Sequence, residues 1–195
     1  VGLPAGPEIA IMHEELASLL PNSTTGEIVI RGDNVTLGYL SNPEANAKSF
    51  SQGWFRTGDQ GYLDDDGYLF ISGRLKEIIN RGGEKISPRE VDEMLLSHPG
   101  IFQAVTFGVP DKTLGDDVAA AVIVRDDHLS ELEIKTYLSD KLAPYKIPNK
   151  IIILDEIPKG PTGKIQRIGL AQKLKFEEVI NPHPPQREAY VPPKN

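Results

Sequence analysis

A Gly/Pro loop with clustered positive charge is the part of the sequence best suited to chemistry on a phosphate. The segment IPKGPTGKIQR, residues 157–167, carries Lys159, Lys164 and Arg167. Gly163 permits a close backbone approach, and Lys164 presents a compact charge to a phosphate or to a developing oxyanion. The segment lacks the GxxxxGK[ST] spacing of a P-loop, and a solvated basic loop explains the same residues. From this pattern alone, both interpretations stay open.

Asp59 and Arg74 are the other polar candidates. A carboxylate can accept hydrogen bonds from the two hydroxyls of a ribose, and a guanidinium close by can donate to the same sugar or to an adjacent oxygen. Each residue also fits an ordinary surface or structural role. Asp59 lies outside the DDDG turn at residues 64–67, so its carboxylate is not needed to form that turn. For the three aspartates of the turn itself, a solvated turn is favoured over a metal site.

The stretch GRLKEIINRGGEKISP, residues 73–88, joins two portions of different charge. Residues 1–73 carry 3 Lys and Arg against 10 Asp and Glu, whereas residues 74–195 carry 18 of each kind. The net charge is −7, so the chain has no basic excess for general nucleic-acid binding, and no nucleic-acid partner is expected. The adjacent glycines Gly82-Gly83 in this stretch favour a turn or a helix entry on their own.

Hydrophobic patterns predict strands before this stretch and an alternation of strands and helices after it. Ser87 with Glu90 predicts a capping box, with Pro88 in the first helical turn, and Ser130 with Glu133 predicts a second one. The order strand, helix, strand, strand, helix, strand predicts an α+β fold. The predicted strands cover residues 8–12, 26–31, 35–39, 104–109, 118–125 and 150–154, a hairpin spans 62–71, and a last helix lies at 167–178.

The composition excludes several classes of site. The chain has no cysteine, which excludes a disulfide framework and a thiolate metal site, and its four histidines lack ligand spacing, so no metal-binding residue is expected. Neither a run of roughly 18 apolar residues nor a signal-peptide pattern occurs, and the terminal PPKN is not the peroxisomal SKL. We therefore expect a cytoplasmic protein with no membrane partner. Because residue 1 is valine, we expect a fragment or a processed chain.

Four motifs in order carry a family resemblance: GEIVIRGDNVTLGY, GWFRTGDQGYLDDDGYLFISGR, LKEIINRGGEKISPREVD and IPKGPTGKIQR. Over residues 1–176 the chain resembles the later part of the adenylate-forming superfamily, which comprises acyl-CoA synthetases, luciferases and the adenylation domains of peptide synthetases. The resemblance implies that residues 1–73 end a large, β-rich adenylation domain and that residues 74–76 form a hinge. Residues 77–180 would then form a small mobile α+β domain, and residues 181–195 a Pro-rich linker.

The resemblance also implies a two-step reaction. A carboxylic acid attacks the α-phosphate of ATP to give an acyl-adenylate and pyrophosphate, and a phosphopantetheine thiol, of CoA or of a carrier protein, then displaces AMP. Asp59 would bind the ribose hydroxyls with help from Arg74, and Lys164 would be the catalytic residue that bridges the carboxylate and the α-phosphate. Lys76 would be the hinge about which the small domain turns, and Gly82-Gly83 would line the pantetheine channel.

Other functional parts of such an enzyme are expected before Val1. They include the Gly/Ser/Thr-rich phosphate loop and the segment that contributes to magnesium and acyl binding. ATP and Mg²⁺ are therefore expected cofactors whose Mg²⁺ ligands lie mostly outside this chain, and the missing N-terminal part of the adenylation domain is an expected partner. We expect the chain alone to be inactive, and the identity of the carboxylic acid substrate is not encoded in it.

Two positions depart from the pattern of some relatives. Plant coumarate ligases and luciferases have lysine in place of Asn80 and glutamine in place of Lys85, so Asn80 is given no catalytic role and oxygenase activity is disfavoured. The segment INRGGEKISP resembles oxalate–CoA ligases and favours CoA as the acceptor. The tail NPHPPQREAYVPPKN resembles a linker to a carrier-protein domain, and its proline content also fits a plain unstructured tail. A non-catalytic interaction module is the alternative from a different class.

Overall fold

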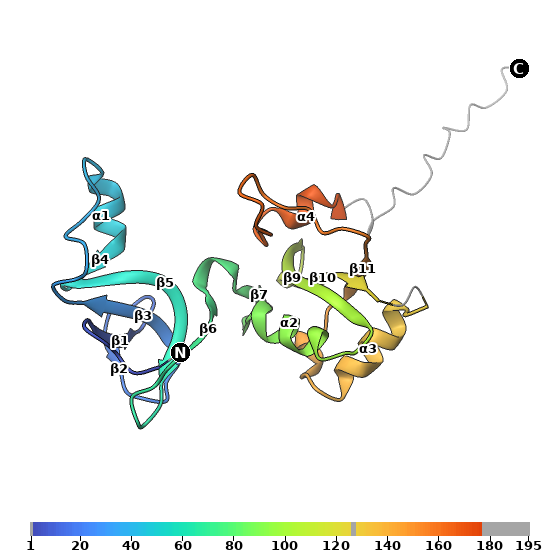
Figure 1. Ribbon diagram of the computed structural model, residues 1–195, viewed down its shortest axis with the longest axis horizontal. Helices are drawn as coiled ribbons and strands as arrows, with labels where there is room; N and C mark the ends of the chain where they lie inside the picture. Colours follow the sequence, from blue (N-terminus) through green and yellow to red (C-terminus); the bar gives the residue numbers. More distant parts are fainter. Residues whose placement is uncertain (1, 126–127, 177–195) are drawn as a thin grey trace, which may run out of the picture.

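The computed structural model describes residues 2–125 and 128–176, and within these residues the fold is α+β with two β-sheets. The fold class expected from the sequence is confirmed. Figure 1 shows the two sheets side by side, with the chain passing from β6 to β7 between them. No helix among the described residues is long and apolar enough to cross a membrane.

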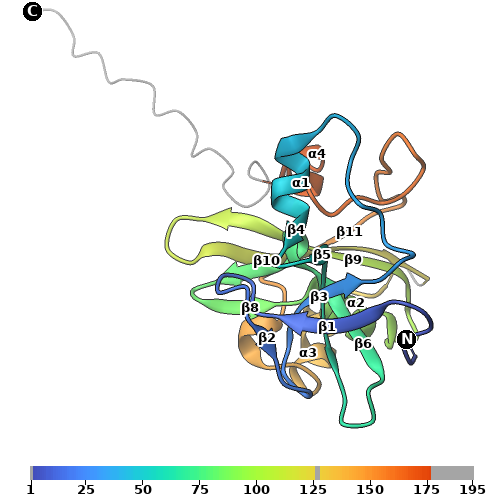
Figure 2. The same ribbon diagram turned by 90° about the vertical axis from the view of Figure 1, so that its left-hand side faces the viewer.

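The first sheet is antiparallel, and its hydrogen-bonded order is β2-β1-β3-β5-β4, with β6 paired to the other part of β5. Its strands within the described residues are β1 (Glu8–Met12), β2 (Leu19–Leu20), β3 (Gly26–Arg31), β4 (Phe50–Ser51), β5 (Trp54–Leu63) and β6 (Leu69–Arg74). In Figure 2 this sheet faces the reader, and α1 (Pro43–Ser49) projects from one end of it. The predicted hairpin is confirmed, because Asp64 N donates to Tyr68 O at 3.0 Å and β5 pairs with β6.

The segment before α1 contradicts the sequence prediction. Residues 35–39 were expected to form a strand, but they run as an irregular connection. The cause is local polar bonding: Asn46 Oδ1 accepts from Tyr39 N at 2.6 Å, and Asn46 Nδ2 donates to Tyr39 O at 3.0 Å, so Tyr39 has no free backbone groups for a ladder. Helix α1 itself was missed, although Asn42-Pro43 is a typical N-cap and first-turn pair, and Asn42 Oδ1 does accept from Ala45 N.

The second sheet has the order β11-β10-β7-β8, and β9 pairs with the other edge of β10. All neighbours are antiparallel except β10 and β11. Short 3₁₀ turns, η1 (Leu75–Glu77) and η2 (Pro144–Lys146), precede β7 and β11. The other elements described are β7 (Ile79–Arg81), β8 (Glu84–Ile86), α2 (Pro88–Leu96), β9 (Ile101–Asp111), β10 (Gly115–Val124), α3 (Glu131–Ser139), β11 (Lys150–Ile153) and α4 (Leu170–Lys173).

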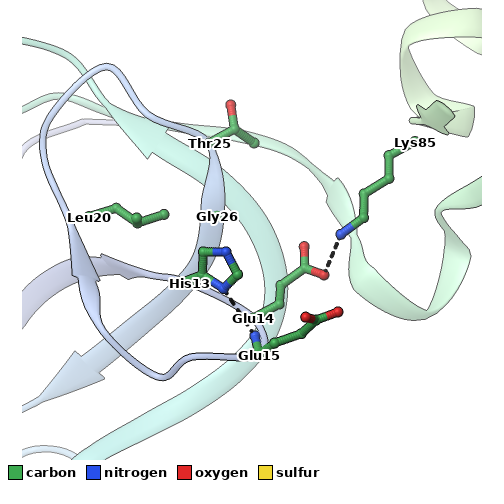
Figure 3. Close-up of a pocket in the computed structure, with 7 residues that line it drawn as sticks. All are labelled: His13, Glu14, Glu15, Leu20, Thr25, Gly26 and Lys85. Carbon is green, nitrogen blue, oxygen red and sulfur yellow. Dashed lines mark hydrogen bonds and ion pairs between the residues drawn. The ribbon is translucent and has the colours of Figure 1, made fainter. Parts of the chain in front are cut away.

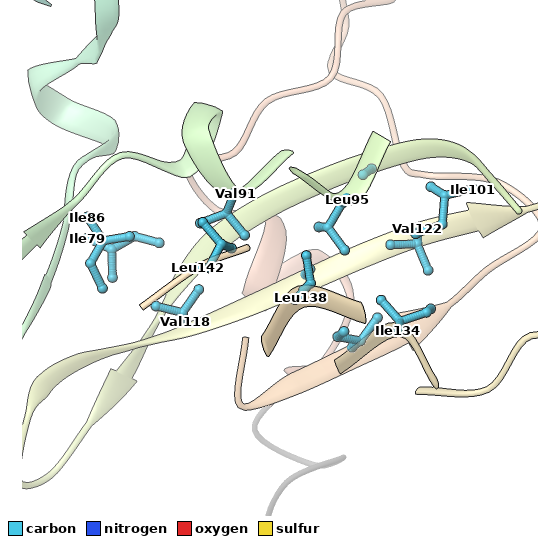
Figure 4. Packing of buried hydrophobic residues seen from close by; sticks show 13 residues of the cluster. Ile79, Ile86, Val91, Leu95, Ile101, Val118, Val122, Ile134, Leu138 and Leu142 are labelled. Atoms are coloured by element: carbon cyan, nitrogen blue, oxygen red, sulfur yellow. The ribbon is translucent and has the colours of Figure 1, made fainter. Parts of the chain in front are cut away.

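Strand β10 is buried on both faces, which explains its unbroken apolar run VAAAV at residues 118–122. Val118, Ala120 and Val122 face a cluster formed with α2 and α3, which Figure 4 shows closing over one side of the sheet. Ala119 and Ala121 face the opposite cluster, where the chain around α4 packs. Figure 1 likewise shows α4 on one side of β9 and β10, with α2 and α3 on the other.

Two helix starts differ in detail from the prediction. Ser87 is the N-cap of α2 and Pro88 is in its first turn, but no capping box forms there, because Ser87 Oγ donates to Ser72 O at 2.6 Å and the Glu90 carboxylate binds Lys146 Nζ. Tertiary partners therefore replaced the local bonds. The last helix, α4, covers only Leu170–Lys173 instead of residues 167–178; residues 174–175 form a turn, and residues 177–178 lie outside the described residues.

The second capping box is confirmed and leads into a charged cluster. Ser130 Oγ accepts from Glu133 N, and the Glu133 carboxylate accepts from Ser130 N at 2.9 Å. Glu131, in the same turn, binds Lys150 Nζ at 2.7 Å and Lys135 Nζ at 2.9 Å. Partial burial disfavours the charged form of Glu131, but hydrogen bonds from these lysines and from a backbone N–H outweigh it and lower its pKa from 4.5 to about 2.

This carboxylate makes the stability of the fold depend on acid pH. Since its folded-state pKa lies below the unfolded-state value, the ionised form stabilises the fold above pH 4.5, and that contribution is lost as the pH falls towards 2. Glu131→Gln should lower the free energy of unfolding by about 1 kcal/mol at neutral pH, after allowance for solvent screening, and by less at each step towards acid. Urea unfolding of both proteins across this range measures the difference.

Glu93→Gln is the matched control, because Glu93 forms an exposed ion pair with Arg89 on α2. Its effect should stay below about 0.5 kcal/mol. A loss from Glu131→Gln that is the same at every pH would contradict the assignment.

Candidate functional site

Asp59 lies in β5, in a section of strand that a buried carboxylate holds in place. Glu27 on β3 is only 2% exposed, and it accepts from Arg56 Nε at 2.6 Å and from Gly58 N at 3.1 Å. Thr57 Oγ1 accepts from Asp59 N at 3.1 Å. The backbone leading into Asp59 is thus fixed, so its carboxylate projects from a rigid frame.

The structure brings Asp59 and Arg74 together. They are ladder partners across β5 and β6, and Arg74 Nε lies 3.0 Å from Asp59 Oδ1. The Asp59 side chain is 26% exposed and that of Arg74 is 66% exposed. Within residues 2–125 and 128–176, Asp59 Oδ2 has no hydrogen-bond donor, so one carboxylate oxygen remains available to hydroxyl groups while the other faces the guanidinium.

Lys76 lies in η1, which begins directly after Arg74 at the end of β6. Its side chain is exposed, and the turn is closed by Ile78 N donating to Leu75 O at 3.3 Å. The turn occupies the connection between the two sheets, which is where a pivot would have to be. The rotation itself stays a prediction.

Gly82 and Gly83 form the two-residue tip of the β7–β8 hairpin. Arg81 and Glu84 pair on either side, and both glycines have positive φ, at +60° and +94°. A turn with two left-handed residues favours glycine at both positions, so the turn alone accounts for their presence. The turn that the sequence favoured for Gly82-Gly83 is therefore present, and a role in a pantetheine channel stays a prediction.

Sequence reasoning missed the residue that anchors this tip. Arg81 Nε lies 2.7 Å from Asp117 Oδ1, and Arg81 Nη1 donates to Tyr145 O at 2.8 Å. Asp117 is 6% exposed and also accepts from Asn149 Nδ2 at 2.8 Å. The hairpin is thereby tied to β10. The available sequence signal was a cation directly before the glycine pair.

Asn80 and Lys85 are opposite each other in the β7–β8 ladder. Asn80 is exposed, whereas Lys85 reaches across to the first sheet, where its Nζ lies 2.8 Å from Glu14 Oε2. Figure 3 shows this ion pair at the rim of a pocket between the two parts of the chain. The pocket is lined by His13, Glu14, Glu15, Leu20, Thr25, Gly26 and Lys85.

Lys164 lies at the exposed end of a tight loop. Gly163 N donates to Gly160 O at 2.9 Å, and Gly160 N donates to Lys164 O at 2.8 Å. Gly163 has φ +76°, and a Cβ built on it would meet nothing within 4 Å, so backbone conformation rather than lack of space favours glycine here. Within the described part of the chain the Lys164 ammonium has no ion-pair partner, and no hydrogen bond or ion pair joins it to Asp59 or Arg74.

Arg167 closes the same loop and binds two carboxylates. Its Nη2 lies 2.6 Å from Asp92 Oδ2, and its Nε lies 3.2 Å from Glu77 Oε2. Burial raises the pKa of Asp92 to about 6, in spite of the facing guanidinium and a hydrogen bond from Thr106 N at 2.6 Å. The sequence pattern grouped Arg167 with the loop cations but did not indicate these partners.

Comparisons with known proteins agree with the motif pattern. Residues 90–164 match the family model described as the AMP-binding enzyme C-terminal domain. An oxalate–CoA ligase of Arabidopsis thaliana is 52% identical over 173 residues, which is 88% of this chain and 34% of that protein. An oxalate–CoA ligase of Saccharomyces cerevisiae is 48% identical over 175 residues, or 88% of this chain and 32% of that protein. The chain thus spans about a third of these relatives.

Solved structures give the same picture. ATP-bound MatB from Rhodopseudomonas palustris matches with a TM-score of 0.81 at 31% identity, covering 88% of this chain and 34% of that one. An o-succinylbenzoate CoA synthetase from Bacillus subtilis, in complex with its acyl-adenylate intermediate, matches with a TM-score of 0.77 at 38% identity, covering 85% of this chain and 34% of that one. By sequence and by fold, the chain belongs to the C-terminal portion of the adenylate-forming superfamily.

Proposed function

We propose that this chain is the C-terminal portion of an ATP-dependent acid–CoA ligase. The observation that carries the proposal is the Asp59–Arg74 pair, which offers an available carboxylate oxygen and an exposed guanidinium at the end of a rigid hairpin. Such a pair suits the vicinal hydroxyls of a ribose. Its position directly before the connection between the sheets supports a nucleotide site at the junction of two parts of one enzyme.

In the first step of the proposed reaction, a carboxylate oxygen of the acid attacks the α-phosphorus of ATP, and the bond to pyrophosphate breaks. Lys164 is the proposed catalytic residue, because its exposed ammonium is unpaired within the described residues. Two unit charges 4 Å apart attract by about 4 kcal/mol at an effective dielectric constant of about 20. That attraction lowers the barrier to the extent that it is stronger in the transition state than in the bound substrates.

In the second step, the thiol sulfur attacks the acyl carbon, the acyl–phosphate C–O bond breaks, and AMP leaves while the thiol proton passes to solvent. We propose that a rotation about Lys76 brings the Gly82-Gly83 tip to the nucleotide site for this step. The Lys164 loop lies between β11 and α4, whereas the glycine tip lies between β7 and β8. Their different positions support separate roles in two orientations of the small domain. The high identity to oxalate–CoA ligases supports CoA as the thiol.

A magnesium ion is implied by a relative whose structure was solved with ATP and magnesium. The described residues contain no group of three or more His, Asp or Glu side chains arranged to hold a metal. This part of the chain therefore does not fit a resident metal site, and we assign no step to the ion here.

A carrier-protein acceptor is the second candidate. The observation that favours it is the tail sequence at residues 181–195, which lies outside the described residues. Offering the full-length protein equal concentrations of CoA and of a phosphopantetheinylated carrier distinguishes the two acceptors by which thioester forms first.

The catalytic role of Lys164 is tested in the full-length protein by Lys164→Ala. Loss of a preorganised charge at the transition state should slow pyrophosphate release by about 10²- to 10³-fold, while thioester formation from isolated acyl-adenylate should change little. Lys159→Ala is the matched control, because Lys159 is in the same loop but pairs with Glu156. An unchanged rate of adenylation would favour a non-catalytic interaction module instead.

The ribose role of Asp59 is tested by Asp59→Asn. Loss of charged hydrogen bonds to the hydroxyls should raise the KM for ATP by about 10-fold or more. With 2′,3′-dideoxy-ATP the two proteins should differ far less, because the hydroxyls are gone. Asp66→Asn, at the exposed tip of the same hairpin, serves as control. An equal penalty with both nucleotides would mean that Asp59 acts only through the fold.

The 195-residue chain by itself should catalyse no exchange between ATP and pyrophosphate. The chain spans about a third of its relatives, and the phosphate-binding and acyl-binding segments expected from the superfamily are not among its motifs. Radiolabelled pyrophosphate exchange measures this directly. Exchange above the background of a Lys164→Ala chain would show that the fragment is catalytically complete.

A further inference from the structure

The contacts within the Lys164 loop shape its backbone, but none of them holds the Lys164 side chain. The loop leaves the second sheet after the buried Ile157 and rejoins the core at Leu170, so its ends are fixed in the same apolar cluster. Between them the described contacts include the hydrogen bonds around Gly160, the isolated bridge between Lys159 and Ile165, and the packing of Ile165 against the same cluster. Lysine has a flexible four-carbon stem, so a loosely held loop would present its charge over a wide volume.

Arg167 adds a charged anchor between the loop and the rest of the second sheet's domain. It lies three residues after Lys164, its side chain is 22% exposed, and it binds Asp92 at 2.6 Å. Asp92 is a buried residue of α2. Its other oxygen accepts from the backbone N–H of Thr106 on β9. A single carboxylate thus joins the loop to a helix and to the edge of the sheet.

The second carboxylate bound by Arg167 belongs to a different element. Glu77 is in η1 and is the residue after Lys76, and its Oε2 lies 3.2 Å from Arg167 Nε. Arg167 Nε is buried and makes no hydrogen bond within the described residues, so Glu77 is held by charge attraction, while the directional hydrogen bond runs from Nη2 to Asp92. The loop that carries Lys164 is therefore tied to the turn proposed as the pivot.

This arrangement is costly as a purely structural device. Asp92 is buried and Arg167 and Glu77 are partly buried, so the three charges lose much of their hydration, and this desolvation offsets part of the attraction. The raised pKa of Asp92 reflects that burial. Apolar side chains could hold a surface loop without this cost, so the charges are better explained by the direction they impose.

We propose that Arg167 is a positioning residue that locks the Lys164 loop to α2 and to the Lys76 turn, so that Lys164 moves with the pivot as one rigid unit. This inference rests on the proposed function. It predicts that Arg167 acts on adenylation through Lys164 and has no direct part in thioester formation.

The test uses the full-length protein with Arg167→Met, which keeps an unbranched side chain and removes the charge. Pyrophosphate release from ATP and acid should slow by about 10-fold, with the KM for ATP within about 2-fold. Thioester formation from isolated acyl-adenylate and CoA should stay within about 2-fold. Arg167→Lys should recover only part of the adenylation rate, because one ammonium cannot hold both carboxylates.

A double variant separates positioning from general damage. If Arg167 acts through Lys164, adding Arg167→Met to Lys164→Ala should slow adenylation no further. Lys173→Met, an exposed cation on α4, is the control and should leave both half-reactions unchanged. Asp92→Asn keeps an acceptor for Thr106 N and is the second variant should Arg167→Met not fold, with the same loss expected.

The outcomes distinguish a failure of the positioning role of Arg167 from a failure of the proposed function. Additive losses in the double variant, or equal slowing of both half-reactions, would overturn the positioning role. Slow Lys164→Ala beside full-rate Arg167→Met and Asp92→Asn would overturn this inference alone. A full-rate Lys164→Ala protein would overturn the proposed function and the inference with it.

Discussion

The antiparallel pairing of β5 with β6 is the constraint on which the candidate site depends. It places Asp59 opposite Arg74, and it ends where the chain leaves the first sheet for the second. The buried Glu27 carboxylate stiffens β5 from the other side by accepting from Arg56 and Gly58. A polar pair on such a frame is preorganised, so little of its binding free energy is spent on ordering the protein side chains.

The second sheet places its functional candidates apart from one another, and the reason is the double burial of β10. Because both faces of β10 are covered, the chain after β11 packs on the face opposite α2 and α3, and the Lys164 loop extends from there. The Gly82-Gly83 tip belongs to the hairpin at the far side of β7. The second sheet and its helices can therefore present either the Lys164 loop or the glycine tip to a nucleotide site. The proposed rotation would exchange one for the other.

Charge pairs of differing burial hold three segments of the candidate site against the rest of the chain. Arg81 ties the glycine tip to Asp117, and Arg167 ties the lysine loop to Asp92. At the contact between the two sheets, Lys85 pairs with Glu14 instead of filling an apolar interface. Such pairs contribute little net stability, but they fix orientation, and the pair at the contact between the sheets can separate into water at small cost.

Much of the fold was predictable from the sequence because it depends on local rules. Hydrophobic period, the Asp-Gly turn and the Ser130–Glu133 box each act within a few residues, and each prediction was confirmed. The strand expected at residues 35–39 and the capping box at Ser87 were wrong, because Asn46 and Ser72 supplied competing partners. Those partners act through a side-chain amide and through a tertiary contact, and hydrophobic periodicity predicts neither kind of interaction.

For the candidate site, the sequence determined which residue types stand at which motif positions, and so it identified Asp59, Arg74 and Lys164 as candidates. Only the tertiary structure decided that Asp59 and Arg74 form a pair and that Arg167 joins Asp92 to Glu77. The physical reason is distance along the chain: Arg167 and Asp92 are 75 residues apart, and no local pattern marks such a pair. Folding brings the charges of Arg167, Asp92 and Glu77 into contact, and their partial burial strengthens the interaction between them.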